Sequence, residues 1–212
     1  MKNKNQFGGF HNGWLTGLHA IAAALIFILY PCTLSAQFIS QPVNLAYLSQ
    51  RADVIVQGRV TKVLRESLAG YPNIRTTVVT INVESSLRGA IEKSYTFREI
   101  SVGLQQNFGK QTYGVGQRLF LFLPSPSQYG LSSPIGTGQG RFHISDDSRG
   151  SATIVNEQGN AGLFRNVEET AVKAGKRLTS SQLKLTATEK GPVALNDFVS
   201  LVKSLMTLPR IR

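Results

Sequence analysis

Residues 75–89, RTTVVTINVESSLRG, decide how this sequence folds. Val79, Ile81 and Val83 recur at every second position and, together with Thr77, point to one side, while polar side chains prevail on the other. This alternation predicts a strand with one apolar face, ending in the polar turn Ser-Ser-Leu-Arg-Gly. Such a strand must pair at both edges and pack on a core, so we expect its neighbours in the chain to be strands too.

The flanking sequence supplies those strands. Further β-rich segments lie at residues 53–64, 94–100, 118–123, 130–135, 140–144 and 152–156. Gly58 inside the first of them indicates a bulge or sharp bend, and the segment RLFLFL, apolar on both faces, indicates the most deeply buried strand. Turn signals separate the segments, at residues 70–73 and in the hairpin turn DDSRG at 146–150. Because no helices alternate with the strands, we expect a mainly β fold, a small antiparallel β-barrel, at residues 37–157.

Two helices frame the expected barrel. Asn44 can cap a short helix at 45–51, and residues 193–208 form an amphipathic helix. Its apolar stripe comprises Leu195, Phe198, Val199, Val202, Leu205 and Met206. We expect this helix to pack on its own domain, with docking on a partner as the alternative. Between barrel and helix, residues 158–192 show no period and are rich in Thr, Ser, Lys and Gly, which predicts a flexible polar linker.

Residues 1–36 have the features of a secretory signal peptide. Lys2 and Lys4 provide a basic start, and residues 20–30, AIAAALIFILY, provide an apolar core. This core is shorter than the roughly 20 residues that span a bilayer. Small residues precede Ala36, after which we expect cleavage, and an uncleaved anchor is the alternative. The sequence therefore predicts an exported protein, periplasmic or extracellular.

The composition limits the chemistry. The only cysteine, Cys32, lies in the leader behind Pro31, which excludes a lipoprotein site, so the exported chain would lack disulfides and thiol ligands. Hydrophobic residues make up 42% of the 212 residues, enough for the core of one domain. The formal net charge is +11, but residues 45–157 hold 12 basic and 8 acidic residues without any cationic run. We therefore expect a mildly cationic surface rather than a dedicated nucleic-acid patch.

Several of these segments resemble a largely uncharacterised group of secreted bacterial domains. The likeness rests on LAYLSQRADVIVQGRV (45–60), TTVVTINVESSLRG (76–89), GVGQRLFLFL (114–123), GQGRFHI (138–144) and LNDFVSLVK (195–203). The group is similar to netrin modules and tissue inhibitors of metalloproteinases, so the resemblance implies an OB-like barrel. Its matching positions are mostly core and turn residues, which inform on fold more than on function.

Two departures limit what the resemblance implies. Metalloproteinase inhibitors chelate the protease zinc through an N-terminal cysteine, whereas the expected mature start here is Gln37 and no cysteine follows. That inhibitory mechanism is therefore not implied for this chain. Residues 100–103, ISVG, also stand where the group usually has a glycine pair.

No metal, cofactor or nucleophile site emerges from the residue pattern. His143 is the only histidine after the leader, and its alternation with Phe142 and Ile144 predicts a surface or barrel-rim position. Asp146 and Asp147 lack the spacing of a calcium loop and suit a polar hairpin turn better. We therefore expect no bound metal.

The glycine run at Gly136, Gly138 and Gly140 precedes a strand rather than a helix, so it is a turn and not a dinucleotide fingerprint. A Ser-His-Asp triad would have to use His143 as its base, and no nucleophile elbow is present. A pair of carboxylates for glycoside cleavage stays open, with no particular pair indicated.

These observations predict a non-enzymatic binding module whose partner is an extracytoplasmic protein or glycan. An inhibitor-like domain that inserts a loop into a protease is one form of this role. Long loops carry binding in barrel folds, so residues 105–113 and 125–137 are the expected surface. OB folds that bind nucleic acid stack bases on exposed aromatics, but Tyr95 and Phe97 are the aromatics of the third strand and the core can claim both. A hydrolase with an unrecognised carboxylate site, or a binder of polyanions or nucleic acid, are the alternatives.

Overall fold

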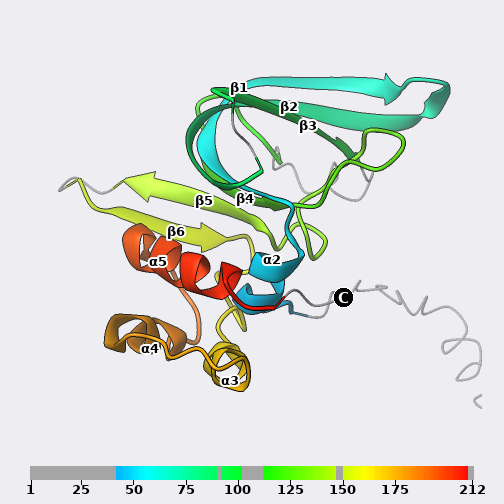
Figure 1. The fold of residues 1–212 in the computed structure, drawn as a ribbon. Helices are drawn as coiled ribbons and strands as arrows, with labels where there is room; N and C mark the ends of the chain where they lie inside the picture. Colours follow the sequence, from blue (N-terminus) through cyan, green and yellow to red (C-terminus); the bar gives the residue numbers. More distant parts are fainter. Residues whose placement is uncertain (1–41, 90–91, 102–111, 147–149, 210–212) are drawn as a thin grey trace, which may run out of the picture. The chain divides into compact units, whose positions relative to one another are not determined.

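The computed structural model describes residues 42–89, 92–101, 112–146 and 150–209, all within the compact unit Ser40–Arg212. Seven strands form one antiparallel sheet in the spatial order β3-β2-β1-β4-β5-β6-β7 (Figure 1). The strands are β1 (Val54–Leu68), β2 (Tyr71–Arg88), β3 (Ser94–Ile100), β4 (Arg118–Leu123), β5 (Arg141–Asp146), β6 (Ala152–Asn156) and β7 (Val193–Ala194). The helices are α2 (Leu45–Arg51), α3 (Val167–Lys173), α4 (Ser180–Thr186) and α5 (Leu195–Met206). The mainly β prediction is therefore confirmed.

The central stretch lies in β2, which pairs with β1 on one edge and β3 on the other, as its alternation predicts. Val79 and Ile81 are fully buried. Both β1 and β2 are longer than the sequence indicates, because backbone pairing continues to Leu68 and Tyr71 through residues that are mostly exposed. An apolar alternation marks only the part of a strand that packs on a core, so this extension leaves no sequence signal.

Gly58 lies at the predicted bulge. The register of the β1–β2 pair shifts between Gln57 and Gly58. A Cβ atom at position 58 would lie 2.4 Å from the backbone oxygen of Asn82. Glycine is therefore required here because the neighbouring strand comes too close for any side chain.

Strand β4 is buried on both faces, as predicted, because it separates two hydrophobic clusters. Phe120 and Phe122 belong to the cluster that includes α5, whereas Leu119, Leu121 and Leu123 belong to the cluster inside β1, β2 and β3. All five side chains are at most 1% exposed. Helix α5 adds Phe198, whose ring centroid lies 5.4 Å from that of Phe120. The prediction that the C-terminal helix packs on its own domain is thus confirmed.

Residues 158–192, which the sequence predicts to be a flexible polar linker, are folded onto the domain. They contain α3 and α4, and they bury Leu163, Phe164 and Leu185 in the same cluster as α5. Each helix is only seven residues long and buries two of them. Two buried residues per helix are too few to produce a visible period, and tertiary packing stabilises such short helices.

The sheet does not close into the barrel that we expected. Its order runs from β3 at one edge to β7 at the other, and the described residues contain no pairing between these strands. The β3 edge instead accepts a hydrogen bond of 2.7 Å from the Ser132 amide to the Arg98 carbonyl. The loop after β4 therefore lies against this edge, and a strand does not.

The expected leader at residues 1–36 lies outside the described part of the chain. Within the described residues, no helix has the length and apolar character needed to cross a membrane. The expected short helix after the leader is present as α2, with the same bounds as predicted. Its Asn44 side chain accepts a hydrogen bond of 2.8 Å from the Tyr47 amide, which confirms the cap.

Candidate functional site

A hollow of about 420 Å³ lies between β1 and the segment before β4. Val63 and Arg65 come from β1, and Tyr113, Gly114 and Val115 form the opposite wall. Val63 and Arg65 are two residues apart on a strand and so point to the same side. We call this hollow the Tyr113 groove.

One wall of the groove is part of a paired strand and the other is a tight turn held by a side-chain hydrogen bond. Val63 pairs with the buried Val79, so the groove side of β1 continues the face that packs on the inner cluster. The 113–117 wall is a tight turn in which the Gln117 side chain accepts a hydrogen bond from the Gly114 amide at 2.8 Å. Val115 is left 71% exposed at this turn. The groove thus has one wall that is part of the core and one that carries an exposed apolar side chain.

The wall residue Tyr113 also belongs to a chain of four polar side chains, which we call the Glu99 cluster: Glu99, Tyr113, Arg141 and Glu157. The Tyr113 hydroxyl donates to a Glu99 carboxylate oxygen at 3.0 Å. The Arg141 guanidinium lies over the Tyr113 ring, 4.8 Å from its centroid, and donates to Glu157. Glu99, Tyr113 and Arg141 are at most 6% exposed. The cluster connects β3, the 113–117 turn and β5.

Burial dominates the electrostatics of this cluster. It raises the pKa of Glu99, and the Arg141 charge and the Tyr113 hydrogen bond lower this pKa without cancelling the rise. Burial likewise raises the pKa of Tyr113 and, with the help of the Arg141 charge, lowers the pKa of His143. The Nε atom of Arg141 is buried without a hydrogen-bond partner among the described residues. The ionisable groups of the cluster are therefore poorly solvated, and removing one partner would lower the free energy of unfolding.

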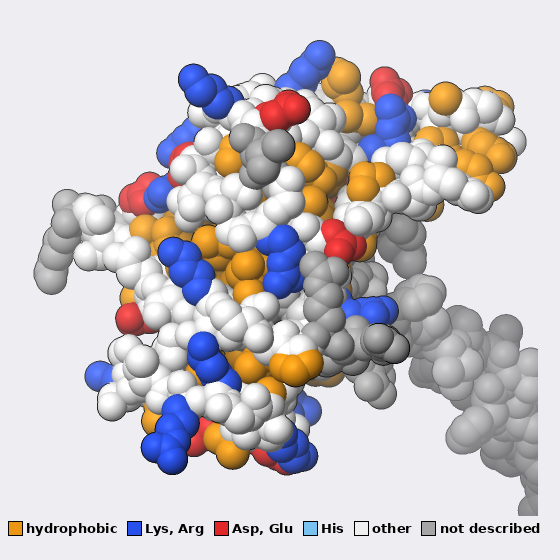
Figure 2. All heavy atoms as spheres, viewed as in Figure 1, with side chains coloured by type: hydrophobic (Ala, Val, Ile, Leu, Met, Phe, Trp, Pro, Cys, Tyr) orange, Lys and Arg blue, Asp and Glu red, His pale blue; other side chains and the backbone are white. Residues whose placement is uncertain are grey.

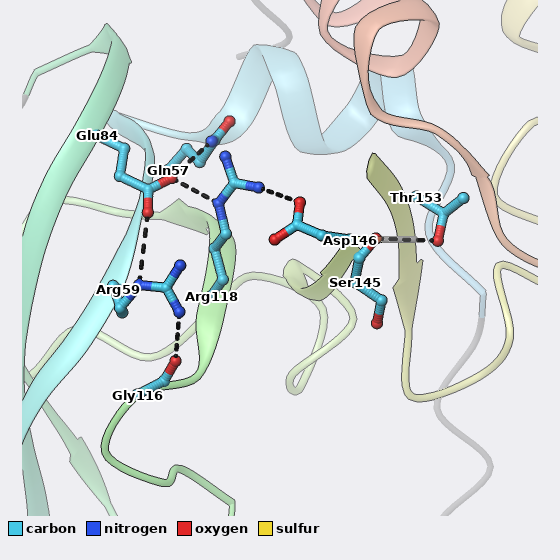
Figure 3. A network of polar contacts seen from close by, with 8 residues as sticks. All are labelled: Gln57, Arg59, Glu84, Gly116, Arg118, Ser145, Asp146 and Thr153. Carbon is cyan, nitrogen blue, oxygen red and sulfur yellow. Dashed lines mark hydrogen bonds and ion pairs between the residues drawn. The ribbon is translucent and has the colours of Figure 1, made fainter. Parts of the chain in front are cut away.

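A second polar network ties the sheet together at the β1–β4 contact (Figure 3). Glu84 accepts from Arg118 at 2.6 Å and from Gln57 at 3.0 Å, and Arg118 also donates to Asp146 at 2.7 Å. Burial would raise the pKa of Glu84, but these hydrogen bonds and the arginine charges outweigh it and lower the pKa. Asp146, one of the two acids considered for calcium, is thus engaged by an arginine, while Asp147 lies outside the described residues.

The remaining predicted residues fall in several places. Phe97 is buried in the cluster inside β1, β2 and β3, and the partly buried Tyr95 packs against it, so both aromatics belong to the core. His143 is partly buried on β5, which agrees with a rim position. Gly136 and Gly138 lie in the turn before β5 with positive φ, which confirms a turn role. No group of three or more potential metal ligands occurs within the described ranges.

Of the two loops expected to carry binding, residues 105–111 lie outside the described part, and Tyr113 is the wall of the groove. The second loop, 125–137, is anchored at its start by Ser125 and near its end by Ile135, whose amide donates to the Phe122 carbonyl at 3.0 Å. Ser125 donates through its hydroxyl and its amide to Asp53, both at 3.0 Å. Near its middle the half-exposed ring of Tyr129 meets Tyr71 at the tip of the β1–β2 hairpin, with a centroid distance of 5.7 Å.

Sequence reasoning missed the Glu99 cluster. One signal was present, because Glu99 has the same alternation phase as Phe97 and therefore occupies a core position with a charged side chain. Arg141 and Tyr113 gave no such signal, since their proximity to Glu99 depends on how the sheet curls. The Tyr71–Tyr129 contact joins residues 58 positions apart and was equally invisible.

Comparisons with known proteins assign no relative. No family model matches the chain, and neither a curated protein nor a solved structure matches it. The groove, the Glu99 cluster that includes its wall residue Tyr113, and the charges on the surface are therefore the features that bear on function.

Proposed function

We propose that this chain is an exported, non-enzymatic binding module that takes an extracytoplasmic protein or glycan in the Tyr113 groove. The hollow itself carries this proposal, because it brings the exposed Val115, the wall residue Tyr113 and the cation Arg65 together around about 420 Å³. Concave sites with a mainly apolar lining and a few polar groups are where ligands bind. The volume of the Tyr113 groove suits one sugar ring or one large side chain of a partner.

The Glu99 cluster supports this role by fixing the groove wall. Tyr113 is held at its hydroxyl by Glu99 and across its ring by Arg141. A tyrosine held at two points loses little freedom on binding, which favours affinity.

The OB-like and netrin-like resemblance belongs to the same proposal. A partly open barrel would need the β3 edge to return toward β4 and β5. The Ser132–Arg98 hydrogen bond and the Glu99 cluster both bring that edge near them, which supports this arrangement. Export is supported by the leader-like sequence of residues 1–36.

A hydrolase is the second candidate, because Glu99 is a carboxyl with a raised pKa directly behind the groove wall. A raised pKa suits a general acid. This function requires a substrate to reach a side chain that is 6% exposed. Hydrolysis of a panel of glycosides and peptides that the Glu99→Gln variant abolishes would support it.

The binding proposal is tested by affinity capture with matched variants. Tagged protein is recovered from the exported fraction of its source, and bound proteins and glycans are identified. Val115→Ala and Arg65→Ala change exposed groove side chains, and Val172→Ala, at a valine that is 62% exposed on α3, is the control. We expect the partner to be lost by the groove variants and kept by the control. A partner that all variants retain equally would place binding elsewhere.

A further inference from the structure

The β1–β2 hairpin extends beyond the part of the sheet that packs on the core (Figure 1). We call residues 61–78 the hairpin arm. Pairing of β2 with β3 ends at Thr76 and Ile100, so the last part of the arm is a ribbon of two strands. Such a ribbon is marginally stable on its own. A long two-stranded extension with mostly exposed side chains therefore points to a role other than core formation.

Aromatic side chains gather at the tip of this arm. Tyr71 and Tyr129 meet edge to face, with an interplanar angle of 87°, and remain 45% and 50% exposed. Leu64 is 41% exposed on the same arm. Figure 2 shows hydrophobic side chains collected at this end of the molecule. The tip is therefore a convex apolar surface rather than a groove.

The arm is also cationic. Lys62, Arg65 and Arg75 are exposed, and none has an ion-pair partner among the described residues. The single acid of the arm, Glu66, is neutralised by Arg98 at 2.7 Å. The arm thus presents positive charge on either side of its aromatic tip.

We propose that the hairpin arm docks on the surface of an anionic lipid bilayer. Tyrosine rings prefer the boundary between acyl chains and head groups, where the ring is buried and the hydroxyl stays hydrated. Arginine and lysine beside such rings are attracted to anionic head groups, each strengthening binding about five-fold near the surface. A convex tip suits a flat surface, whereas an extended peptide would need a groove. The protein would then be held at the membrane by its arm, which shares Val63 and Arg65 with the Tyr113 groove.

The test is sedimentation of the full exported protein with vesicles. One set contains phosphatidylcholine and phosphatidylglycerol, and the other contains phosphatidylcholine alone. We expect binding to the anionic vesicles that weakens as salt rises. The Tyr71→Ala/Tyr129→Ala double variant should bind about tenfold more weakly, and Arg75→Gln about five-fold more weakly.

Control variants separate this site from the groove and from general charge. Arg177→Gln removes an exposed cation outside the arm, and Val115→Ala changes the groove, so both should bind vesicles as the parent does. Circular dichroism shows that each variant is folded. Equal binding of the tip variants and the parent, or no binding to anionic vesicles, would overturn the proposal. Retention on heparin without vesicle binding would also overturn it, because the arm cations would then serve an anionic glycan.

Discussion

Removing Arg141 should expose how much of the fold depends on the Glu99 cluster. Arg141→Leu places an apolar side chain on β5 and removes the charge that partly compensates the burial of Glu99. It also removes the guanidinium that lies 4.8 Å from the Tyr113 ring centroid. Glu99 would then be a buried carboxylate with only the Tyr113 hydroxyl as partner.

The expected cost at pH 7 is about 3 kcal/mol of unfolding free energy. Breaking a buried charge pair by removing one partner costs about 3–5 kcal/mol. Arg141 and Glu99 interact through space rather than by a direct ion pair, which places the value at the lower end. Loss of the pair with Glu157 adds little, because the Glu157 side chain is 52% exposed.

The pH dependence gives the sharper test. A carboxyl whose pKa is raised in the folded state contributes stability that is complete below the unfolded pKa and is lost as pH rises through the folded pKa. Burial already raises the pKa of Glu99, and loss of Arg141 raises it further. The cost of Arg141→Leu should therefore shrink below the ordinary carboxyl pKa of about 4.3, where Glu99 is protonated in both states. Glu99→Gln in the same background should recover much of the loss at pH 7.

Urea unfolding at neutral pH and at about pH 4 measures these free energies. Arg118→Leu is the matched control, since its partner Glu84 has a lowered pKa. Stability from that pair is lost only as pH falls through the lowered folded pKa of Glu84, so the cost of Arg118→Leu should shrink at a lower pH than the cost of Arg141→Leu. A cost for Arg141→Leu that is the same at both pH values, and additive with Glu99→Gln, would refute the reasoning.

Substitutions at three further positions test the packing. Phe198→Ala removes a ring that is fully buried among three phenylalanines. Urea unfolding should show that the free energy of unfolding falls by about 3–5 kcal/mol, and a fall below about 1 kcal/mol would contradict the role of α5 in the core. Gly58→Ala places a Cβ 2.4 Å from the Asn82 oxygen and should lower stability by about 1–3 kcal/mol in thermal unfolding, whereas an unchanged melting temperature would mean that the strands separate easily. Asn160 is fully buried with φ of 60°, and its side chain donates to the Ile154 and Gly191 carbonyls at 3.1 and 2.9 Å. Asn160→Ala should cost about 2–4 kcal/mol by denaturant unfolding, and Asn160→Gly less, because glycine removes the backbone strain; equal costs would leave the strain without effect.

The parts of the fold that local physics dictates were predictable from residues. Alternation in β2, apolar residues on both faces of β4 and the cap at Asn44 all specify their elements without reference to distant contacts. The Gly58 bulge was predictable for the same reason, since glycine in a strand marks a close backbone approach. Helices α3 and α4 were not, because the few residues that each buries acquire meaning only against the rest of the cluster.

The candidate site was predictable only in outline. A loop ending at Tyr113 and a loop over 125–137 were expected to bind, and the structure places Tyr113 at a groove and Tyr129 at an exposed tip. The groove itself needed β1, whose residues Val63 and Arg65 carried no signal of their own.

The sequence by itself determined the periodic elements, the caps and turns, the cationic balance and the leader-like start, because each follows from neighbours within a few residues. Tertiary structure alone decided that the sheet stays open, that Glu99 meets Tyr113 and Arg141, and that Tyr71 meets Tyr129. Those outcomes depend on the curvature of the sheet and on contacts between residues tens of positions apart, such as the 58 that separate Tyr71 from Tyr129. No local pattern encodes such distances, since they arise from how the strands twist and how two cores divide the apolar side chains between them.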